Sequence, residues 1–223
     1  MNESDHITNY FMKIPQFPYD YIGSKAEEYE NQKWMERNQK RTTFKCIQYL
    51  FDKELGKDNH NILKDFPYLI LDLGCGTGFS SEMLISSGFR VVGVDILSDM
   101  LIKANAKREN LKISNLELIL ADINYLPIKS NSIDHILSIS SYNFITYEKY
   151  GREKKKVVNN TAKYLNKILK KKGRVIIEFY PENDEELELF TDSFKNNGFD
   201  GYMIKNNPKQ KSGQIYLLLK KKR

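Results

Sequence analysis

The chain has 223 residues, of which 40% are hydrophobic, so it is long enough to bury one full core and short enough to favour a single domain. Its 35 Lys and Arg residues exceed its 29 Asp and Glu residues, and the formal charge of +6 favours a polyanionic partner such as RNA, although a Lys-rich solvated surface explains it equally well. Two cysteines without a CxxC pair or a Cys/His cluster argue against a disulfide framework and against a zinc site, and we expect no bound metal.

The N-terminal residues carry no signal for export or for a membrane. Residues 1–6 lack the basic and then apolar run of a signal peptide, and no apolar stretch reaches the length that spans a bilayer. The sequence therefore predicts a cytoplasmic protein without a membrane segment.

The first part of the chain predicts a loop followed by helix. Residues 1–20 are polar and aromatic and contain two helix-breaking prolines, so this arm is expected to be loop-like. From residue 24 to about residue 51 helix formers prevail, and we expect one or two helices there. Ser24 is the candidate cap of the first one, and Glu27 is the acid of its capping box.

Beyond residue 67, strands alternate with helices. The run 68–73 is short and apolar, as in a strand buried on both faces of a sheet. The elements expected after it are a helix at 80–87, a strand at 90–94, a helix at 99–107, strands at 116–120 and 135–139, a helix at 157–169, a strand at 174–179, a helix at 185–196, and strands at 201–204 and 213–219. This alternation predicts an α/β fold with a doubly wound, mostly parallel, seven-stranded sheet. The turn-rich residues 206–209 predict that the last two strands form an antiparallel pair.

The first predicted strand runs directly into the glycine-rich turn Asp72-Leu73-Gly74-Cys75-Gly76-Thr77-Gly78. Glycine has no side chain to keep a ligand off the backbone, and it tolerates positive φ in a tight turn. The turn therefore suits a ligand that lies against bare peptide. The dinucleotide fingerprint GxGxxG does not fit, because Phe79 stands where its third glycine belongs, and no Gly-Lys-Ser/Thr follows as in a P-loop.

Acidic residues stand at the ends of three consecutive predicted strands. Asp95 ends the second strand, where such folds place the acid that accepts hydrogen bonds from both ribose hydroxyls. Asp122 follows the third strand, where a carboxylate can receive the exocyclic amine of an adenine. Asp72 ends the first strand, where it can accept from the ammonium of a ligand or bond the backbone amides of the loop. Asp95 or Asp122 alone also suits a cap of the next helix or turn, but three acids in this arrangement favour a ligand site.

Together the Asp72-x-Gly-x-Gly-x-Gly turn, Asp95 and Asp122 resemble the motifs of class I S-adenosylmethionine-dependent methyltransferases, over roughly residues 66–180. The resemblance implies a Rossmann-like methyltransferase fold and S-adenosylmethionine as the cofactor. It also implies a set of cofactor-binding residues, namely Asp72, Gly74, Cys75, Gly76, Asp95, Ile96, Asp122, Ile123, Ser138 and Tyr29.

The methyl acceptor is expected beside the segment 138–144, which ends the fourth strand. Methyltransferases of exocyclic amines typically carry an Asn/Asp-Pro-Pro-aromatic turn there, and this segment contains no proline. Cytosine carbon-5 enzymes need a nucleophilic Cys near a Pro, whereas Cys75 lies in the glycine-rich turn. A ring nitrogen such as N7 of guanine has an exposed lone pair and carries no proton, so positioning can suffice without a general base. We assign no catalytic residue.

Over most of residues 19–219 the chain resembles the eukaryotic small-subunit ribosomal RNA guanine-N7 methyltransferase family. The segments that carry this resemblance are Ala26-Glu27-Glu28-Tyr29, Trp34-Met35, Gln39, Ser138-Ile139-Ser140-Ser141, Tyr180-Pro181-Glu182-Asn183 and Gly198-Phe199-x-Gly201. It implies a single domain, 1–223, in which residues 1–65 form an N-terminal arm and a helical lid over the cofactor. Tyr29 and Trp34 are then candidate lid residues, and packing of these aromatics on the core is the alternative.

The resemblance also implies partners and an acceptor pocket. Family members act on ribosomal RNA and work with a small zinc-binding activator protein that adds a strand to the edge of the sheet. The chain departs from the family at 142–144 and in its C-terminus, where the basic extension is reduced to residues 220–223. The acceptor-pocket candidates are Ser140, Tyr142, Asn143, Phe144 and Tyr180.

Two aromatic and several basic residues are expected to contact the RNA. The rings of Tyr142 and Phe144 can stack a flipped base, and Lys149, Arg152 and residues 154–156 can meet phosphates, unless the last group is only a solvated helix start. The leading hypothesis is methylation of the guanine ring nitrogen N7 in ribosomal RNA. A small-molecule methyltransferase and a non-catalytic ribosome-assembly factor with the same fold are the alternatives.

Overall fold

The computed structural model describes residues 16–56, 66–205 and 214–222. Most of the predicted arm at 1–20, the predicted turn at 206–209 and the first residue of the predicted strand 213–219 lie outside the described residues.

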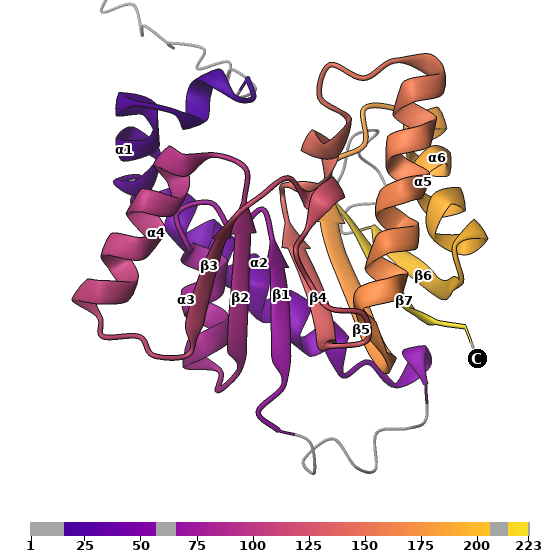
Figure 1. Cartoon of the computed structure of the whole chain (residues 1–223), viewed down its shortest axis with the longest axis horizontal. Helices are drawn as coiled ribbons and strands as arrows, with labels where there is room; N and C mark the ends of the chain where they lie inside the picture. The colour runs from indigo at the N-terminus through magenta and orange to yellow at the C-terminus, as the bar shows by residue number, and fades with distance from the viewer. Residues whose placement is uncertain (1–15, 57–65, 206–213, 223) are drawn as a thin grey trace, which may run out of the picture.

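The described residues form a seven-stranded sheet, which runs through the middle of the molecule (Figure 1). Its strands are β1 (Leu69–Leu73), β2 (Arg90–Asp95), β3 (Leu116–Leu120), β4 (Ile133–Ile139), β5 (Leu169–Phe179), β6 (Phe199–Lys205) and β7 (Ile215–Lys221). Their spatial order is β3-β2-β1-β4-β5-β7-β6. The first five strands are parallel, and β7 lies antiparallel between β5 and β6. The predicted mostly parallel sheet with an antiparallel C-terminal pair is confirmed.

Helices cover both faces of this sheet (Figure 1). On one face lie α2 (Lys33–Leu50) and α3 (Phe79–Ser86), with α4 (Ser98–Asn110) beside β2 and β3. On the other face lie α5 (Gly151–Ile168) and α6 (Asp184–Asn196). Short 3-10 helices occur at Tyr19–Tyr21 (η1), Lys53–Leu55 (η2), Ile123–Tyr125 (η4) and Tyr142–Thr146 (η5). None of the helices in the described part of the chain is long and apolar enough to cross a bilayer.

Side chains that alternate along each strand contribute to the two hydrophobic cores, one on each face of the sheet. Leu217 and Leu219 of β7 enter the core under α5 and α6, whereas Tyr216 and Leu218 enter the core under α2 and α3. Successive side chains of a strand point to opposite faces, so a continuous apolar run is buried on both. Helix α5 begins six residues before the predicted 157–169 helix, because its first turns carry charged side chains and show no apolar period.

The helical segment predicted at 24–51 is two helices, α1 (Ser24–Glu30) and α2, which meet at Asn31 and Gln32. The predicted capping box at Ser24 is wrong, because Ser24 is the first residue of α1 and its N-cap, Gly23, makes no side-chain cap bond. The Gly23 amide instead donates to Oδ2 of Asp99 (2.5 Å), at the start of α4. A contact across the fold therefore anchors this helix.

Ion pairs fasten α1 further to α4. Glu27 lies 3.7 Å from the ammonium of Lys103, and Glu30 lies 3.1 Å from that of Lys107. Figure 1 shows α1 above α4, beyond the carboxyl ends of β1 to β3. Helix α1 is thereby placed above the sheet edge at which the predicted site residues gather.

Candidate active site

The glycine-rich turn leaves β1 where the strand order reverses, with β2 on one side and β4 on the other. Ligands of doubly wound sheets bind in the crevice at such a point, outside the carboxyl ends of the strands. The amides of Gly74 and Cys75 both donate to the carbonyl of Val94 (2.8 and 2.9 Å), which ties the turn to the end of β2. The turn ends at Gly78, whose left-handed φ of 87° precedes the first residue of α3.

The end of β4 packs directly on this turn. Ser138 and Ser141 each donate a hydroxyl hydrogen bond to the carbonyl of Leu73 (3.0 and 2.6 Å). This packing leaves no room for a side chain at Gly74, because an added Cβ would lie 2.4 Å from Cβ and Oγ of Ser141. The predicted cofactor residue Ser138 is fully buried and holds β4 against the turn.

Asp95 lies at the end of β2 with its carboxylate beside the turn. Oδ2 accepts from the amide of Gly76 (2.8 Å), and Oδ1 accepts from the amide of Leu97 (2.9 Å). Burial raises the pKa of this carboxyl above its usual value, while the hydrogen bonds from backbone amides oppose the rise. A carboxylate oxygen can accept a second hydrogen bond, so both oxygens retain a site for a ligand hydroxyl.

Asp72 is completely buried at the end of β1. The hydroxyls of Ser80 and Ser81, at the start of α3, both donate to Oδ2 (2.6 Å each). Oδ1 has no hydrogen-bond partner among the described residues. Burial raises the pKa of this carboxyl to about 6, against the opposing effect of the two serine hydrogen bonds. The predicted bond from Asp72 to backbone amides of the loop is not among its contacts, which are to serine side chains.

The raised pKa makes Asp72 a source of pH-dependent stability. Between pH ~4 and ~6 the folded chain holds a proton that the unfolded chain releases, so the free energy of unfolding falls as pH rises. Asp72→Asn removes this titration, and its amide oxygen can still accept from Ser80 and Ser81. We expect urea unfolding to show wild type losing about 2 kcal/mol relative to Asp72→Asn between pH ~4.5 and ~7.

Asn160→Ala is the control for this measurement, since Asn160 is exposed on α5 and carries no titratable group. Its difference from wild type should stay flat over the same pH interval. A flat difference for Asp72→Asn as well would contradict the raised pKa.

Asp122 caps η4. The sequence left open whether this residue would cap the next helix or turn or would bind a ligand. Its Oδ1 accepts from both the backbone amide and the side-chain nitrogen of Asn124 (2.8 Å each). Both hydrogen bonds fall on Oδ1, so Oδ2 can accept a hydrogen bond from a further donor. Ile96 is half exposed and Ile123 partly buried, as suits residues that would flank a planar base.

Cys75 is buried in the turn rather than offered to a substrate. Desolvation raises the pKa of its thiol well above the usual value, and the nearby carboxylates of Asp72 and Asp95 add to the rise. The thiol is therefore kept protonated, and its sulfur fills the space beside Gly93 of β2. This environment gives Cys75 a packing role.

Glu178, at the end of β5, was missed by the sequence reasoning. It is fully buried, and it accepts from the hydroxyl of Ser140 (2.6 Å) and the side-chain nitrogen of Gln214 (2.8 Å). Ser140 adopts a left-handed φ of 54°, a conformation that non-glycine residues rarely adopt. The signal was present, since Glu178 is an acid at the carboxyl end of a strand, like Asp72 and Asp95.

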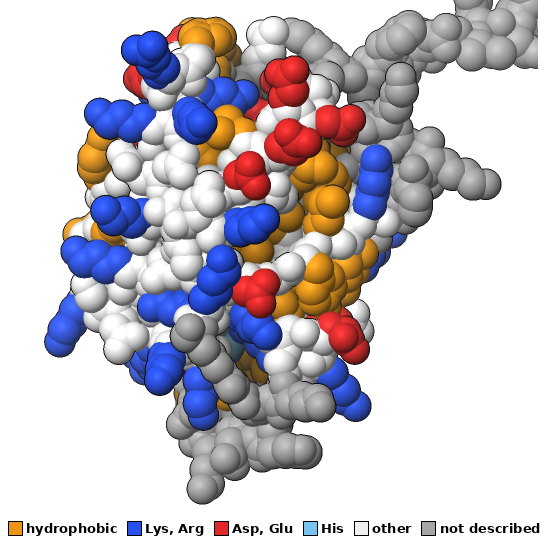
Figure 2. All heavy atoms as spheres, turned by 90° about the vertical axis from the view of Figure 1, so that its right-hand side faces the viewer, with side chains coloured by type: hydrophobic (Ala, Val, Ile, Leu, Met, Phe, Trp, Pro, Cys, Tyr) orange, Lys and Arg blue, Asp and Glu red, His pale blue; other side chains and the backbone are white. Residues whose placement is uncertain are grey.

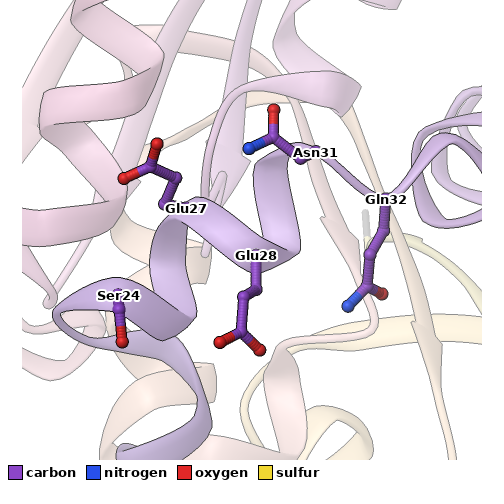
Figure 3. A pocket seen from close by; sticks show the side chains of 5 residues that line it. All are labelled: Ser24, Glu27, Glu28, Asn31 and Gln32. Atoms are coloured by element: carbon purple, nitrogen blue, oxygen red, sulfur yellow. The ribbon is translucent and has the colours of Figure 1, made fainter.

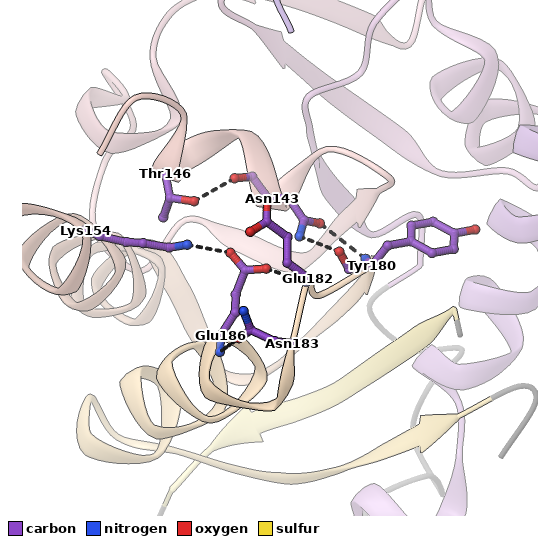
Figure 4. Close-up of polar contacts among 7 residues, drawn as sticks. All are labelled: Asn143, Thr146, Lys154, Tyr180, Glu182, Asn183 and Glu186. Atoms are coloured by element: carbon purple, nitrogen blue, oxygen red, sulfur yellow. Dashed lines mark hydrogen bonds and ion pairs between the residues drawn. The ribbon is translucent and has the colours of Figure 1, made fainter. Parts of the chain in front are cut away.

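Asn143 and Tyr180 join the ends of β4 and β5 (Figure 4). The side-chain nitrogen of Asn143 donates to the carbonyl of Tyr180 (3.0 Å), and its oxygen accepts from the amide of Tyr180 (3.3 Å). Figure 4 shows the Tyr180 ring pointing away from this pair, and the ring is half exposed. The side-chain amide of Asn143 thus binds the backbone of Tyr180, while the side chain of Tyr180 is hydrogen-bonded with Glu178 and Gln214.

The residues after Tyr180 cap α6. Asn183 accepts from the amide of Glu186 (2.9 Å), and Glu186 accepts from the amide of Glu182 (2.7 Å). Lys154 of α5 completes the group with an ion pair to Glu186 (2.7 Å), as Figure 4 shows. The predicted phosphate contact of Lys154 therefore competes with a carboxylate that is nearly buried.

The predicted stacking of a base on Tyr142 is wrong. Tyr142 is completely buried, and its ring lies 5.5 Å from that of Phe190 and 5.6 Å from that of Phe194. Both phenylalanines belong to α6, so Tyr142 turns from the end of β4 into the core. Its hydroxyl has no hydrogen-bond partner among the described residues, and no base can reach the ring.

Phe144 faces the N-terminal segment. Its ring stacks on that of Phe17 (4.6 Å, 16°) and lies 5.7 Å from that of Tyr21. Tyr21 in turn contacts the ring of Tyr29, which stacks at 6.2 Å on Phe79, the first residue of α3. An aromatic row thus spans the carboxyl edge from α3 to η5.

The two predicted lid residues differ in their surroundings. Tyr29 of α1 lies within the aromatic row and accepts a hydrogen bond from Gln39 (3.2 Å). Trp34, at the start of α2, is half exposed. The structure brings Tyr29 to the site and leaves Trp34 on the outer surface of the helices.

A shallow hollow lies along α1 (Figure 3). It is lined by Ser24, Glu27, Glu28, Asn31 and Gln32. Its carboxylates are already paired, Glu27 with Lys103 and Glu28 with Lys25. No group of three or more His, Cys, Asp or Glu side chains suited to a metal occurs in the described ranges. The hollow therefore offers no comparable binding chemistry.

Comparisons with known proteins agree with this geometry. A family model described as a methyltransferase domain matches residues 67–222. The 18S rRNA (guanine-N(7))-methyltransferase of Bos taurus is 33% identical over 163 residues, which cover 70% of this chain and 55% of that protein. The 18S rRNA (guanine-N(7))-methyltransferase bud23 of Schizosaccharomyces pombe is 30% identical over 155 residues, which cover 69% of this chain and 56% of that protein. The chain spans about half the length of these curated relatives.

Solved structures share the fold. The PH0226 protein from Pyrococcus horikoshii OT3 aligns with a TM-score of 0.65 and 20% identity, over 88% of this chain and 99% of that one. A chain from the complex between the Haloferax volcanii Trm112 methyltransferase activator and the putative methyltransferase aligns with a TM-score of 0.53 and 17% identity, over 70% of this chain and 78% of that one. At these identities the likeness concerns the fold alone.

Proposed function

This chain belongs to the methyltransferase domain family, and from that membership we propose that it transfers the methyl group of S-adenosylmethionine to the ring nitrogen N7 of a guanine in ribosomal RNA. The relatives from Bos taurus and Schizosaccharomyces pombe are named as 18S rRNA (guanine-N(7))-methyltransferases, which supports this acceptor. The protein would act where small ribosomal subunits are assembled, and its placement in the cytoplasm stays a prediction.

The residues at the carboxyl edge fit S-adenosylmethionine, whose sulfonium supplies an electrophilic methyl group. Asp95 would hold the ribose hydroxyls, Asp122 the adenine amine and Asp72 the ammonium. The fit is supported by Oδ1 of Asp72, a buried carboxylate oxygen without a donor among the described residues. A bound ammonium would give this oxygen a charged partner and favour its ionised form.

The observation that carries the acceptor assignment is the pairing of Asn143 with the backbone of Tyr180. An exocyclic amine needs groups that accept its N–H hydrogens and its departing proton, and the amide of Asn143 is already engaged at both polar atoms. The N7 atom of guanine presents a lone pair and no proton, so it needs neither. The chain would work by holding the guanine in line with the methyl group.

Transfer of labelled methyl to total RNA, protein and small molecules tests this proposal. We expect label in RNA when the chain is supplied with S-adenosylmethionine. Label confined to small molecules would establish a small-molecule methyltransferase instead. A chain that binds ribosomal precursors and transfers no label would be a non-catalytic assembly factor.

The ring of Phe144 is the proposed stacking surface for the acceptor base, which would replace the ring of Phe17. Stacking of one base on an aromatic ring contributes about 1–3 kcal/mol, so Phe144→Ala should lower kcat/KM for RNA by about 10- to 100-fold. Binding of S-adenosylmethionine should not change. Phe17→Ala should not raise the KM for RNA, because it removes the competing ring.

Phe44→Ala is the matched control, since Phe44 is half exposed on α2 and lies away from η5. Its steady-state kinetics on RNA should equal those of wild type. An unchanged kcat/KM in Phe144→Ala, or a loss shared by Phe44→Ala, would refute the stacking surface.

The proposed activator would add a strand at the free edge of β3. This strand contains no Lys, and large aliphatic side chains are exposed on and beside it, namely Leu120 (59%), Leu111 (56%) and Ile102 (63%). Lysine on an edge strand blocks strand addition. Leu120→Lys should therefore abolish copurification with a small zinc-binding activator of the 18S enzymes, whereas Met203→Lys on the opposite edge strand, β6, should not. The reverse outcome would place the activator at β6.

A further inference from the structure

The exposed face of α5 is almost purely basic. Its exposed cations recur at helical spacing and are Arg152, Lys155, Lys156, Lys163 and Lys167. Between them the same face carries Asn159 and Asn160. The opposite face of the helix is buried in the core by residues such as Val158 and Leu165. The five cations therefore form one stripe, which we call the α5 stripe, about 22 Å long.

The cations of the α5 stripe have no carboxylate partner in the described ranges. The other basic residues near the start of α5 do, since Lys149 pairs with Glu153 (3.0 Å) and Lys154 with Glu186 (2.7 Å). The two kinds of lysine are thereby distinguished by structure. Carboxylates of the protein offset the charges of Lys149 and Lys154, whereas no carboxylate in the described ranges offsets those of the stripe.

The neighbouring helix presents the opposite charge. The exposed residues of α6 include the acids Asp184, Glu185, Glu188 and Asp192. Figure 2, which views the side of the molecule with α5 and α6, shows Lys and Arg gathered on the left and a group of Asp and Glu at the upper right. A polyanion would be attracted to the α5 stripe and repelled by the acids of α6. These two charged surfaces would therefore orient a bound polyanion along α5 and away from α6.

The stripe begins at the acceptor side of the site. Arg152 lies in the first turn of α5, shortly after η5 ends at Thr146. Tyr150, the N-cap of α5, is 80% exposed. Basic side chains joined to an exposed aromatic ring are the combination that holds a nucleic-acid backbone and stacks a base.

We propose that the α5 stripe is the track on which the phosphate backbone of the RNA substrate lies, leading from η5 along α5 and away from α6. This inference rests on the proposed function for its choice of polyanion. Phosphates bound there would fix the register of the RNA without reading its sequence. The RNA strand bound to the stripe would place its target base at the carboxyl edge of the sheet.

The test compares two triple variants of equal charge. Lys156→Gln, Lys163→Gln and Lys167→Gln together remove three cations of the stripe. Lys33→Gln, Arg37→Gln and Arg41→Gln together remove three exposed cations from α2, on the other face of the sheet. The probe is a labelled hairpin of small-subunit ribosomal RNA, titrated at salt concentrations from about 50 to 200 mM.

Each phosphate contact contributes about 0.7 to 0.9 to the slope of log K against log salt, so the stripe variant should lose about 2 to 3 in slope and bind at least 10-fold more weakly at the lowest salt. The α2 variant should keep the slope of wild type. Equal losses in both variants would mean that only net charge matters, and no loss in the stripe variant, or no binding by wild type, would also overturn the inference.

Methyl transfer separates this inference from the proposed function. If wild type binds the hairpin through the α5 stripe but never methylates RNA, the proposed function is refuted. The proposal that RNA binds along the stripe then stands. A wild type that methylates RNA while the stripe variant retains its affinity and its salt slope would overturn the track alone.

Discussion

Asp95→Ala is expected to weaken binding of S-adenosylmethionine by about 100-fold or more. The wild-type carboxylate would accept from two ribose hydroxyls, and hydrogen bonds to charged groups contribute about 1.5–3 kcal/mol each. The substitution also leaves the amides of Gly76 and Leu97 without the acceptor that they have now. Isothermal titration calorimetry measures the loss, and circular dichroism verifies that the variant is folded.

Asp192→Ala is the control, because Asp192 is exposed on α6 and lies outside the site. Its affinity for S-adenosylmethionine should equal that of wild type. If Asp95→Ala bound S-adenosylmethionine as tightly as wild type, the cofactor site would not lie at the carboxyl end of β2. The proposed enzyme activity would then be refuted as well.

Gly74→Ala is expected to be the most destabilising substitution in the turn. The added Cβ would lie 2.4 Å from Ser141, and the backbone has a left-handed φ of 70°. Left-handed backbone costs a non-glycine residue about 1–2 kcal/mol and overpacking a further 1–3 kcal/mol, so the free energy of unfolding should fall by about 3 kcal/mol. For a chain of this length the midpoint of thermal unfolding should drop by about 10 °C.

Gly151→Ala isolates the steric part of this effect. Gly151 also has a left-handed φ, of 49°, but a Cβ added there meets nothing within 4 Å. It should lose only the backbone contribution, about 1 kcal/mol, and its midpoint should fall by about 3 °C. Equal losses at the two positions would show that β4 does not press on the turn as described.

The sheet could be predicted because its causes are local. An apolar run such as 69–73 predicts a strand that is buried on both faces of the sheet. The glycines that follow predict a turn whose backbone is not covered by side chains. The same reasoning extends to Glu178, whose position at the end of β5 matches that of the acids already singled out. It lies on the fifth strand, outside the run of three consecutive strands whose terminal acids form the recognised pattern.

The lid and the acceptor side could not be predicted in the same way. The start of α1 depends on Asp99, which is far from Gly23 in the sequence, so the local capping pattern at Ser24 misled. Tyr142 was expected to stack a flipped base, yet its ring packs against Phe190 and Phe194 of α6. Contacts between residues far apart in the sequence determine both the start of α1 and the burial of Tyr142. Local sequence patterns do not predict such contacts.

The identity of the methylated nucleoside distinguishes guanine-N7 methylation from every other acceptor. Small-subunit ribosomal RNA is incubated with the chain and labelled S-adenosylmethionine, digested to nucleosides and separated, with Asp95→Ala as the inactive control. We expect wild type to place the label in 7-methylguanosine and the control to place none. Label in a methylated exocyclic amine, in a methylated pyrimidine carbon or in no nucleoside at all would contradict it.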